Sequence, residues 1–255
     1  TVDQPVLARS GDNLRIDWGY VYLAAPAQQG LRTRIANAGA RAEFLSSGVL
    51  SDADELDIPL ASRYHPVLAA SFDLGPVAAE TVSCHLMLAY DDLFSLQYFQ
   101  RNLRPWWRRN GDGAVELLRA AAKDLPSLVE RSRRFDEALT SDLTRAGGRE
   151  YAEIAVLAYR QALAAHKLAA DIDGTPIYLS KENFSNGCIG TVDVFYPAAP
   201  VFLLLNPALI KAQMTPIFDY ARTGRWPWPY SPHDLGQYPL ANGQVYGGGE
   251  KSEDN

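Results

Sequence analysis

Asn110-Gly111-Asp112-Gly113 separates two parts of the sequence that differ in their hydrophobic pattern. Before this stretch, short apolar runs are bounded by Gly, Pro or Asp, a pattern typical of β-strands. After it, apolar residues recur at intervals of three and four, a pattern typical of amphipathic helices. We therefore predict an α+β protein of more than one domain, in which strands come first and helices follow.

The predicted strands lie between Asn13 and Asp92. Leu14 to Leu23 mixes β-branched and aromatic residues, and Pro66 to Leu74 and Ala79 to Ala89 are short apolar-rich runs. Because no helical pattern separates these runs, they indicate an antiparallel β-sandwich or part of one. Leu93 to Trp107 fits either a last strand or a short helix.

The clearest predicted helix is Tyr151 to Ala170, which Gly147-Gly148 precedes and Asp173-Gly174 follows. A stripe that is apolar except for Gln161 follows the helical period and comprises Ile154, Leu157, Ala158, Gln161, Ala162, Ala165 and Leu168. Further helices are predicted over Val115 to Leu139, which Pro126 should kink or divide, and over Val194 to Leu205 and Pro207 to Tyr220. The resulting domains are a β-sandwich portion over 1–109, a linker helix region over 110–145 and a helical domain that starts at 146 and runs to 255.

Composition restricts the classes of partner. The 255 residues are 47% hydrophobic and 21% charged, and a net charge of -6 at pH 7 gives no general attraction to nucleic acid or an anionic bilayer. The longest apolar run, Ala198 to Leu205, is too short to cross a membrane. Basic residues between Arg101 and Arg109 interleave with Trp106 and Trp107, and we interpret them as a solvated linker at an interdomain joint rather than a nucleic-acid site.

Sequence motifs of several common enzyme classes are absent. The chain has no Gly-x-Ser-x-Gly elbow, no Ser-x-x-Lys pair and no His-Glu-x-x-His motif. Its 4 histidines show no metal-ligand spacing, and Cys84 and Cys188 specify neither a disulfide framework nor a metal site. The sequence therefore predicts no metal and no cofactor. His85 and His166 are expected in a strand and at a helix end, with structural roles.

A stretch from Tyr178 to Asp193 concentrates polar groups between two apolar runs. Those of chemical interest are Lys181, Glu182, Asn183, Asn186 and Asp193. Because the stretch follows the strand-like Thr175 to Leu179, we predict that its polar groups are displayed from a rigid base. The alternative is a hydrogen-bonded loop that only caps the next helix.

A second candidate stretch is the aromatic, Pro-rich segment from Trp226 to Gly236. Its rigidity limits the entropy lost when a ligand is held, and the indoles of Trp226 and Trp228 offer flat apolar faces. His233 differs from the other histidines because its neighbour, Asp234, is acidic. The alternative is a hydrophobic lid over the core.

The candidates for carboxylate chemistry are Glu182, Asp193, Asp219 and Asp234. A hydrolytic pair needs one protonated and one ionised carboxyl group. We expect Asp193, which is flanked by apolar residues, to be desolvated and to act as the acid. Glu182, beside Lys181, is expected to be ionised and to act as the base or as an anchor. The alternative for Asp193 is a helix N-terminal residue that the macrodipole favours.

Six short motifs occur in order along nearly the whole chain: Arg15 to Ala24, Leu88 to Asp92, Ala158 to Ala162, Ser180 to Gly187, Gly190 to Val194 and Pro232 to Gly236. Together they resemble the secreted microbial glutaminase A family. The resemblance implies a β-sandwich followed by a six-hairpin (α/α) toroid related to those of glycoside hydrolases, in a protein usually exported. It also implies hydrolysis of the side-chain amide of glutamine to glutamate and ammonia.

Members of that family continue past the region matched by Tyr238 to Gly248 into further helices. A closed toroid needs about twelve helices. Twelve helices and their connections require more residues than the chain has after Asn110. We therefore expect an incomplete toroid here, with the remainder of the same polypeptide as a partner. Because the chain does not begin with Met, we expect either a removed leader or a piece of a larger polypeptide.

The function favoured by the sequence is an extracellular or cell-surface hydrolase resembling glutaminase A, acting on a small molecule or a saccharide. The residues predicted to be catalytic are Glu182, Asp193 and Asp234. Substrate contacts are predicted from Lys181, Asn183, Asn186, Trp226, Trp228 and His233. The alternatives are a six-hairpin glycoside hydrolase and a noncatalytic carbohydrate-binding module.

Overall fold

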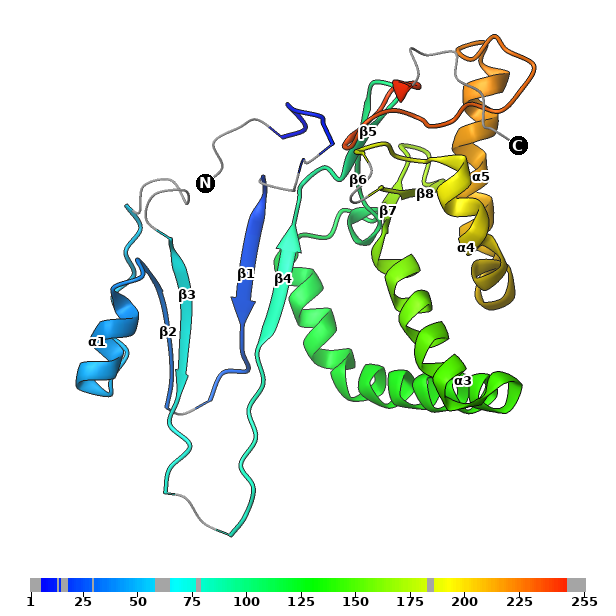
Figure 1. Ribbon diagram of the computed structural model, residues 1–255. Coiled ribbons are helices and arrows are strands. Elements are labelled where there is room, and N and C mark those ends of the chain that lie inside the picture. Colours follow the sequence, from blue (N-terminus) through cyan, green and yellow to red (C-terminus); the bar gives the residue numbers. More distant parts are fainter. Residues whose placement is uncertain are drawn as a thin grey trace. The chain divides into compact units, whose positions relative to one another are not determined.

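Two antiparallel strand pairs form the first part of the chain in the computed structural model (Figure 1). β1 (Tyr20–Ala24) pairs with β4 (Met87–Asp91), and β2 (Leu31–Ala36) pairs with β3 (Val67–Phe72). The structure describes residues 6–12, 14, 18–28, 30–57, 65–76, 79–182 and 186–246. The predicted order, antiparallel strands first and a long helical region after them, is confirmed.

The chain forms two units. The first contains residues 17–91 together with 114–122, and the second contains 6–16, 92–113 and 123–255. The predicted domain limits at 109 and 145 stay a prediction.

A helix in the first unit, α1 (Ala40–Ser47), was not predicted because its eight residues carry no continuous apolar stripe. It ends at Gly48, which has a φ of 70° and whose N–H donates to the carbonyl of Phe44. Arg34 of β2 is 9% exposed, and its guanidinium lies 2.6 Å from Glu43 of α1 and 2.7 Å from Glu55. The two carboxylates therefore compensate the charge that this strand turns inward.

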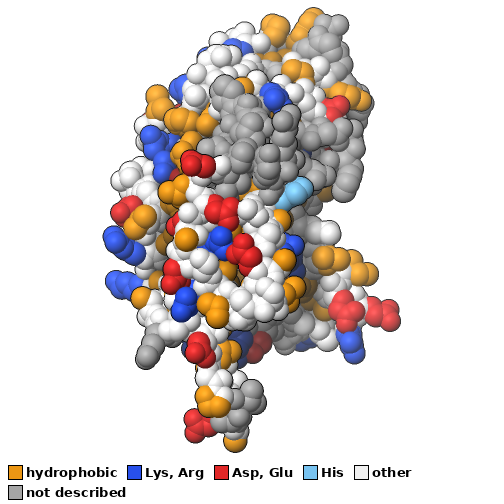
Figure 2. Space-filling view, turned by 90° about the vertical axis from the view of Figure 1, so that its left-hand side faces the viewer, with side chains coloured by type: hydrophobic (Ala, Val, Ile, Leu, Met, Phe, Trp, Pro, Cys, Tyr) orange, Lys and Arg blue, Asp and Glu red, His pale blue; other side chains and the backbone are white. Residues whose placement is uncertain are grey.

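Charged side chains of both signs are interspersed on the face of the molecule shown in Figure 2. Apolar side chains lie singly or in small groups between them. None of the helices described is both long and apolar enough to span a bilayer.

The longest helix, α3 (Ala114–Ala164), follows the Gly-rich break. Its backbone stays helical at Pro126, and the residue with non-helical angles is Gly148, with φ 85° and ψ 176°. Glycine reaches this region without the steric cost that a Cβ atom imposes. The division predicted at Pro126 is therefore found at Gly148.

The helix predicted over Tyr151 to Ala170 ends at Ala164, and this is a correction. His166 begins a strand instead, β7 (His166–Ala170), which pairs with β8 (Pro176–Ser180). The Ala-rich segment has no strong strand preference of its own, so the pairing with Ile177 and its neighbours overrides helical propensity. The strand predicted over Thr175 to Leu179 is confirmed as β8.

Five short strands form a sheet in the second unit, in the order β8-β7-β6-β5-β9. The three further strands are β5 (Leu96–Tyr98), β6 (Arg101–Pro105) and β9 (Leu240–Ala241), and β9 runs parallel to β5. A 3₁₀ turn, η1 (Trp106–Arg108), follows β6, and the guanidinium of Arg109 lies 4.4 Å above the ring of Trp106. Strands of two to five residues are too short for periodicity to reveal.

Two helices, α4 (Val192–Leu205) and α5 (Pro207–Arg222), form a hairpin that packs beside β8 (Figure 1). Both were predicted, and Asn206-Pro207 separates them as expected. The core beneath them comprises Tyr178, Phe202 and Ala212, with Leu168 and Leu209 packed against it.

His166 is partly buried against Tyr178 and Phe202 of this core and has a structural role, although in a strand rather than at a helix end. Its Nδ1 contacts the carbonyl of Ala162 at 2.5 Å, Nε2 contacts Nε2 of Gln213 at 2.6 Å, and the ring stacks on Tyr178. Burial lowers its pKa below the ordinary value for histidine. His85, by contrast, is exposed and precedes β4 rather than lying in a strand.

Candidate active site

The two polar stretches identified in the sequence lie side by side. The N–H of Leu235 donates to the carbonyl of Ile189 at 2.9 Å, and the N–H of Ile189 donates to the carbonyl of Gly236 at 3.0 Å. The N–H of Val192, at the start of α4, donates to the carbonyl of His233 at 3.1 Å. These backbone bonds hold the end of one loop against the middle of the other.

Gly236 makes this pairing sterically possible. Its φ is 138°, and an added Cβ atom would collide with the backbone carbonyl oxygen of Leu240. Its N–H donates to Oδ1 of Asp234 at 2.8 Å, so the turn and the carboxylate hold each other in place.

Asp234 is fully buried and hydrogen-bonded on both oxygens. Besides Gly236, the N–H groups of Val245 and Tyr246 donate to it at 3.2 and 3.4 Å. Its Oδ2 lies 3.0 Å from Nδ1 of His233. A carboxylate fixed by three backbone donors therefore sets the orientation of the imidazole.

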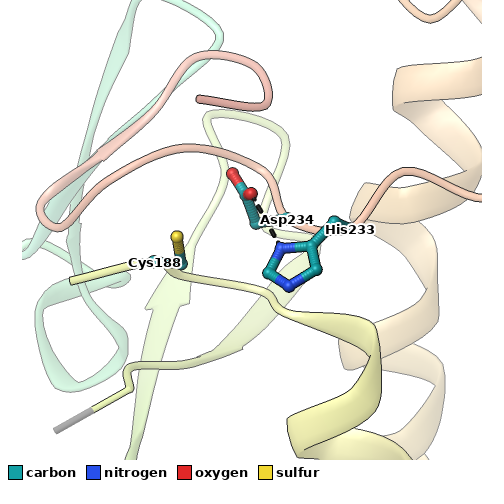
Figure 3. A group of neighbouring side chains, drawn as sticks. All are labelled: Cys188, His233 and Asp234. Carbon is teal, nitrogen blue, oxygen red and sulfur yellow. Dashed lines mark hydrogen bonds and ion pairs between the residues drawn. The ribbon is translucent and has the colours of Figure 1, made fainter. Parts of the chain in front are cut away.

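His233 is itself held from several sides. Its side chain is 7% exposed, its ring stacks on Tyr246 with centroids 4.6 Å apart, and its N–H donates to Oε1 of Gln244 at 2.8 Å. Because Asp234 occupies Nδ1, Nε2 is the nitrogen left for an external group. Figure 3 shows this nitrogen pointing away from Asp234.

Glu182, Asp193 and His233 meet at one place. One side-chain oxygen or nitrogen from each lies within 4.8 Å of the others. The three come from different segments: Glu182 follows β8, Asp193 lies in the first turn of α4, and His233 lies in the aromatic segment. The fold thus brings residues 51 positions apart in the sequence into one cluster.

The burial expected for Asp193 is not found. Its side chain is exposed because the first turn of α4 turns this position to solvent. Asp193 does lie where the helix dipole favours a negative charge, as the alternative interpretation predicts. Glu182 is half-buried.

Lys181 and Asn186 have contacts that shape the loop. Nζ of Lys181 donates to the backbone carbonyl of Glu182 at 3.2 Å and lies 5.4 Å from the ring centroid of Tyr238. Oδ1 of Asn186 accepts the N–H of Cys188 at 2.8 Å, which forms a local turn. Asn183 lies outside the described residues.

The two indoles differ in their surroundings. Trp226 is 3% exposed, and its Nε1 donates to the carbonyl of Tyr230 at 2.5 Å, so it packs as part of the interior. Trp228 is 45% exposed and stacks on Tyr230 with an interplanar angle of 8°. Of the two, Trp228 is the one that is exposed to solvent.

Asp219, the fourth candidate carboxylate, has other partners. Its Oδ2 accepts the hydroxyl of Tyr98 at 3.0 Å, and Oδ1 lies 2.7 Å from Arg222. Burial, reinforced by the charge of Asp219, raises the pKa of Tyr98. Its contacts therefore indicate a structural role.

Sequence reasoning missed Cys188. Its thiol sulfur, a ring nitrogen of His233 and a carboxylate oxygen of Asp234 lie within 4.8 Å of one another (Figure 3). Burial, and then the charges of Asp234 and Glu182, raise the pKa of this thiol to about 12. The thiol is therefore protonated at neutral pH and is not a nucleophile. Its position within the polar loop was the available signal.

Asp12 was also missed. Its Oδ1 accepts the N–H of Gly187 at 3.0 Å and Nε2 of Gln237 at 2.6 Å, so one exposed carboxylate links both loops. Neither periodicity nor a local motif connects residue 12 with these positions.

Comparisons with known proteins bear on the same regions. The family described as "Glutaminase A six helical-hairpin domain" matches residues 148–253, and a domain of unknown function, DUF5127, matches residues 1–142. Glutaminase A of Aspergillus oryzae (strain ATCC 42149 / RIB 40) is 31% identical over 97% of this chain and 37% of its own length. A probable glutaminase of Arthroderma benhamiae (strain ATCC MYA-4681 / CBS 112371) is 28% identical over 88% of this chain and 27% of its own length.

The chain therefore spans little more than a third of the first of these curated relatives and less of the second. No solved structure matches it.

Proposed function

We propose, because this chain belongs to the glutaminase A family, that it forms part of a hydrolase that converts glutamine to glutamate and ammonia. The observation that carries the proposal is the meeting of Glu182, Asp193 and the oriented His233 within 4.8 Å. Such a cluster accepts a proton from water at one atom and returns a proton to a leaving nitrogen at another.

In the proposed reaction, a water oxygen attacks the side-chain carbonyl carbon and its proton passes to the cluster. The carbon–nitrogen bond then breaks, and the nitrogen leaves as ammonia after taking up that proton. Glu182 is the better placed base because it is half-buried and therefore less hydrated than exposed Asp193. Asp234 acts as a positioning residue through His233.

The intact polypeptide is the proposed catalyst, with the rest of it packed on the α4–α5 hairpin. Support for this comes from the apolar side chains that the hairpin exposes, including Leu203 (61%), Leu204 (82%) and Phe218 (51%). Further helical hairpins are the natural cover for such a surface in a six-hairpin domain. We further propose that the protein is exported, which fractionation of the producing culture into cells and medium tests.

Ammonia release from L-glutamine by the full-length protein tests the proposed reaction. We expect Glu182→Gln and Asp193→Asn each to reduce kcat by about 10²- to 10⁴-fold, the range that general acid or base groups contribute. Asp136→Asn, which neutralises an exposed carboxylate on α3, is the matched control and should leave the rate unchanged. Glutamine turnover that survives both site changes would contradict the proposal.

A glycoside hydrolase is the second candidate. The specific observation in its favour is the approach of carboxylate oxygens of Glu182 and Asp193 to within 4.8 Å, near the spacing of about 5–5.5 Å in retaining glycosidases. Reducing-sugar release from a glycan panel, measured on the same preparation, separates the two reactions. If neither product forms, a binding module that uses the exposed Trp228–Tyr230 pair is favoured, and binding should then survive both site changes.

A further inference from the structure

We propose that Glu182, Asp193 and His233 bind a divalent transition-metal cation of the zinc or manganese type. The three donor atoms lie within 4.8 Å of one another. Asp234 holds the imidazole at Nδ1, 3.0 Å from its Oδ2. Glu182, Asp193 and the imidazole are close enough to one another to share an ion.

The spacing fits a small cation. A metal about 2.0–2.2 Å from each ligand holds pairs of ligands about 3 to 4.4 Å apart. Rotation of either carboxylate about its side-chain bonds covers the remaining few tenths of an ångström. Asp193 is exposed, so an ion reaches the cluster from solvent without any opening of the core.

The imidazole is prepared for this role. Metal-bound histidines commonly donate their second ring N–H to a carboxylate, which fixes the tautomer and the ring orientation. Asp234 provides that carboxylate at 3.0 Å from Nδ1, and three backbone N–H groups hold it in place. Nε2 of His233 is left without a hydrogen-bond partner among the described residues, although the side chain is 7% exposed.

The other cluster, Cys188 with His233 and Asp234, is less suited to an ion. Nδ1 of His233 and both oxygens of Asp234 already have partners. An ion bound in this cluster would break those contacts, so the cluster of Glu182, Asp193 and His233 is the better candidate.

Two carboxylates and one imidazole leave coordination positions for water. A bound cation lowers the pKa of such a water, which would supply the nucleophile for the hydrolysis proposed above. The hydroxyls of Ser180 and Thr191, two residues before Glu182 and Asp193, are buried without a hydrogen-bond partner in the described structure. Buried hydroxyls of this kind are commonly satisfied by ordered water.

Isothermal titration of the chelator-treated full-length protein with Zn²⁺ and Mn²⁺ tests the site directly. We expect one cation per chain, bound with micromolar or tighter affinity, and a rise in Tm when it binds. Glu182→Gln, Asp193→Asn and His233→Ala should each weaken binding at least tenfold, and Asp234→Asn about 10- to 100-fold as a positioning residue. Asp136→Asn is the matched control and should bind as the unmodified protein does. Circular dichroism establishes that each variant is folded.

Cys188→Ala distinguishes the two clusters. This variant should bind the cation with unchanged affinity. If Cys188→Ala loses cation binding while Glu182→Gln retains it, the proposal is overturned. The proposal also fails if folded protein binds neither ion, or if only millimolar Ca²⁺ binds. Because binding is measured without substrate, a protein that binds the cation but releases no ammonia would refute the glutaminase proposal and leave the cation site standing.

Discussion

Cys188 and Cys84 differ in the two properties that control the reactivity of a thiol. Cys188 is buried, and its pKa is raised to about 12, whereas Cys84 is exposed. Alkylation requires the thiolate. At the scale of single residues, burial and then the charges of Asp234 and Glu182 therefore keep the Cys188 thiol protonated and unreactive.

Iodoacetamide at pH 8 should modify Cys84 in the folded protein and leave Cys188 unmodified. The fraction of Cys188 thiolate stays small until the pH approaches about 12, because its folded-state pKa is raised. Peptide mass spectrometry before and after guanidinium denaturation measures this, and both thiols should react in denaturant. Equal labelling rates of the two cysteines in the native state would disprove the prediction.

His166 should make stability depend on pH. Burial lowers its pKa in the folded state, so the unfolded chain binds a proton more readily as the pH falls through about 6.5. The free energy of unfolding is then highest above that pH and declines below it, by at most about 1.4 kcal/mol per pH unit for one proton.

Urea unfolding at pH 7.5 and pH 5 measures the decline. His166→Gln should remove this part of the pH dependence, at a lower stability overall because the stacking on Tyr178 is lost. His85→Gln, at an exposed position, is the control and should retain it. An unchanged pH dependence in His166→Gln would count against the argument.

The candidate residues could be chosen from the sequence because each polar stretch lies beside an apolar segment that fixes it. Glu182, Asp193 and His233 do lie together, although the cluster itself could not be derived. Its formation depends on backbone pairing between loops and on Asp12, 175 residues before Gly187. The exposure of Asp193 follows from the rotation of one helical turn, which flanking apolar residues do not specify.

At the scale of elements, helices whose ends are marked by helix-breaking residues were the easiest to predict. α4 and α5 match their expected limits closely because a Pro and an Asn mark the break between them. The helix end at Ala164 was missed because the local pattern favours continuing the helix to Ala170. In the structure, His166 to Ala170 pair with strand β8 instead. The sheet in the second unit depends on pairs far apart in the sequence, such as β5 with β9.

Two glycines test how turns support these elements. Gly236 and Gly148 both have positive φ, but an added Cβ atom collides with the carbonyl of Leu240 at Gly236 and meets nothing within 4 Å at Gly148. We expect Gly148→Ala to cost about 1 kcal/mol from backbone strain alone. Gly236→Ala should cost about 3 kcal/mol or more, since the backbone itself must shift.

Denaturant titration of both variants measures the difference. Gly236→Ala should also weaken the pairing of the two loops and so reduce activity of the full-length protein. Equal losses in the free energy of unfolding of the two variants would show that the close approach at Gly236 does not contribute to stability.

At the scale of the whole molecule, the proposed cover of the exposed apolar face of α4 by the rest of the polypeptide can be tested. Leu204 is 82% exposed in this chain. Leu204→Asp should therefore hardly change the stability of the isolated chain but cost about 2 kcal/mol or more in the full-length protein, where the charge would be buried.

Ile172→Asp is the matched control for Leu204→Asp. Ile172 is 81% exposed in the turn between β7 and β8, outside the hairpin. Its substitution should have a small effect in both proteins. Equal effects of Leu204→Asp in the isolated and full-length proteins, measured by thermal unfolding, would argue against a covering partner on α4.

The bond from Asp12 to Gln237 also sets an order of events during synthesis. Translation at about 5–20 residues per second separates the two residues, 225 positions apart, by about 10 to 45 s. During this interval the segment around Asp12 has been synthesised but lacks the loop that it anchors. A chaperone that shields newly made segments of a growing polypeptide would thus have to cover the segment around Asp12 for at least that time.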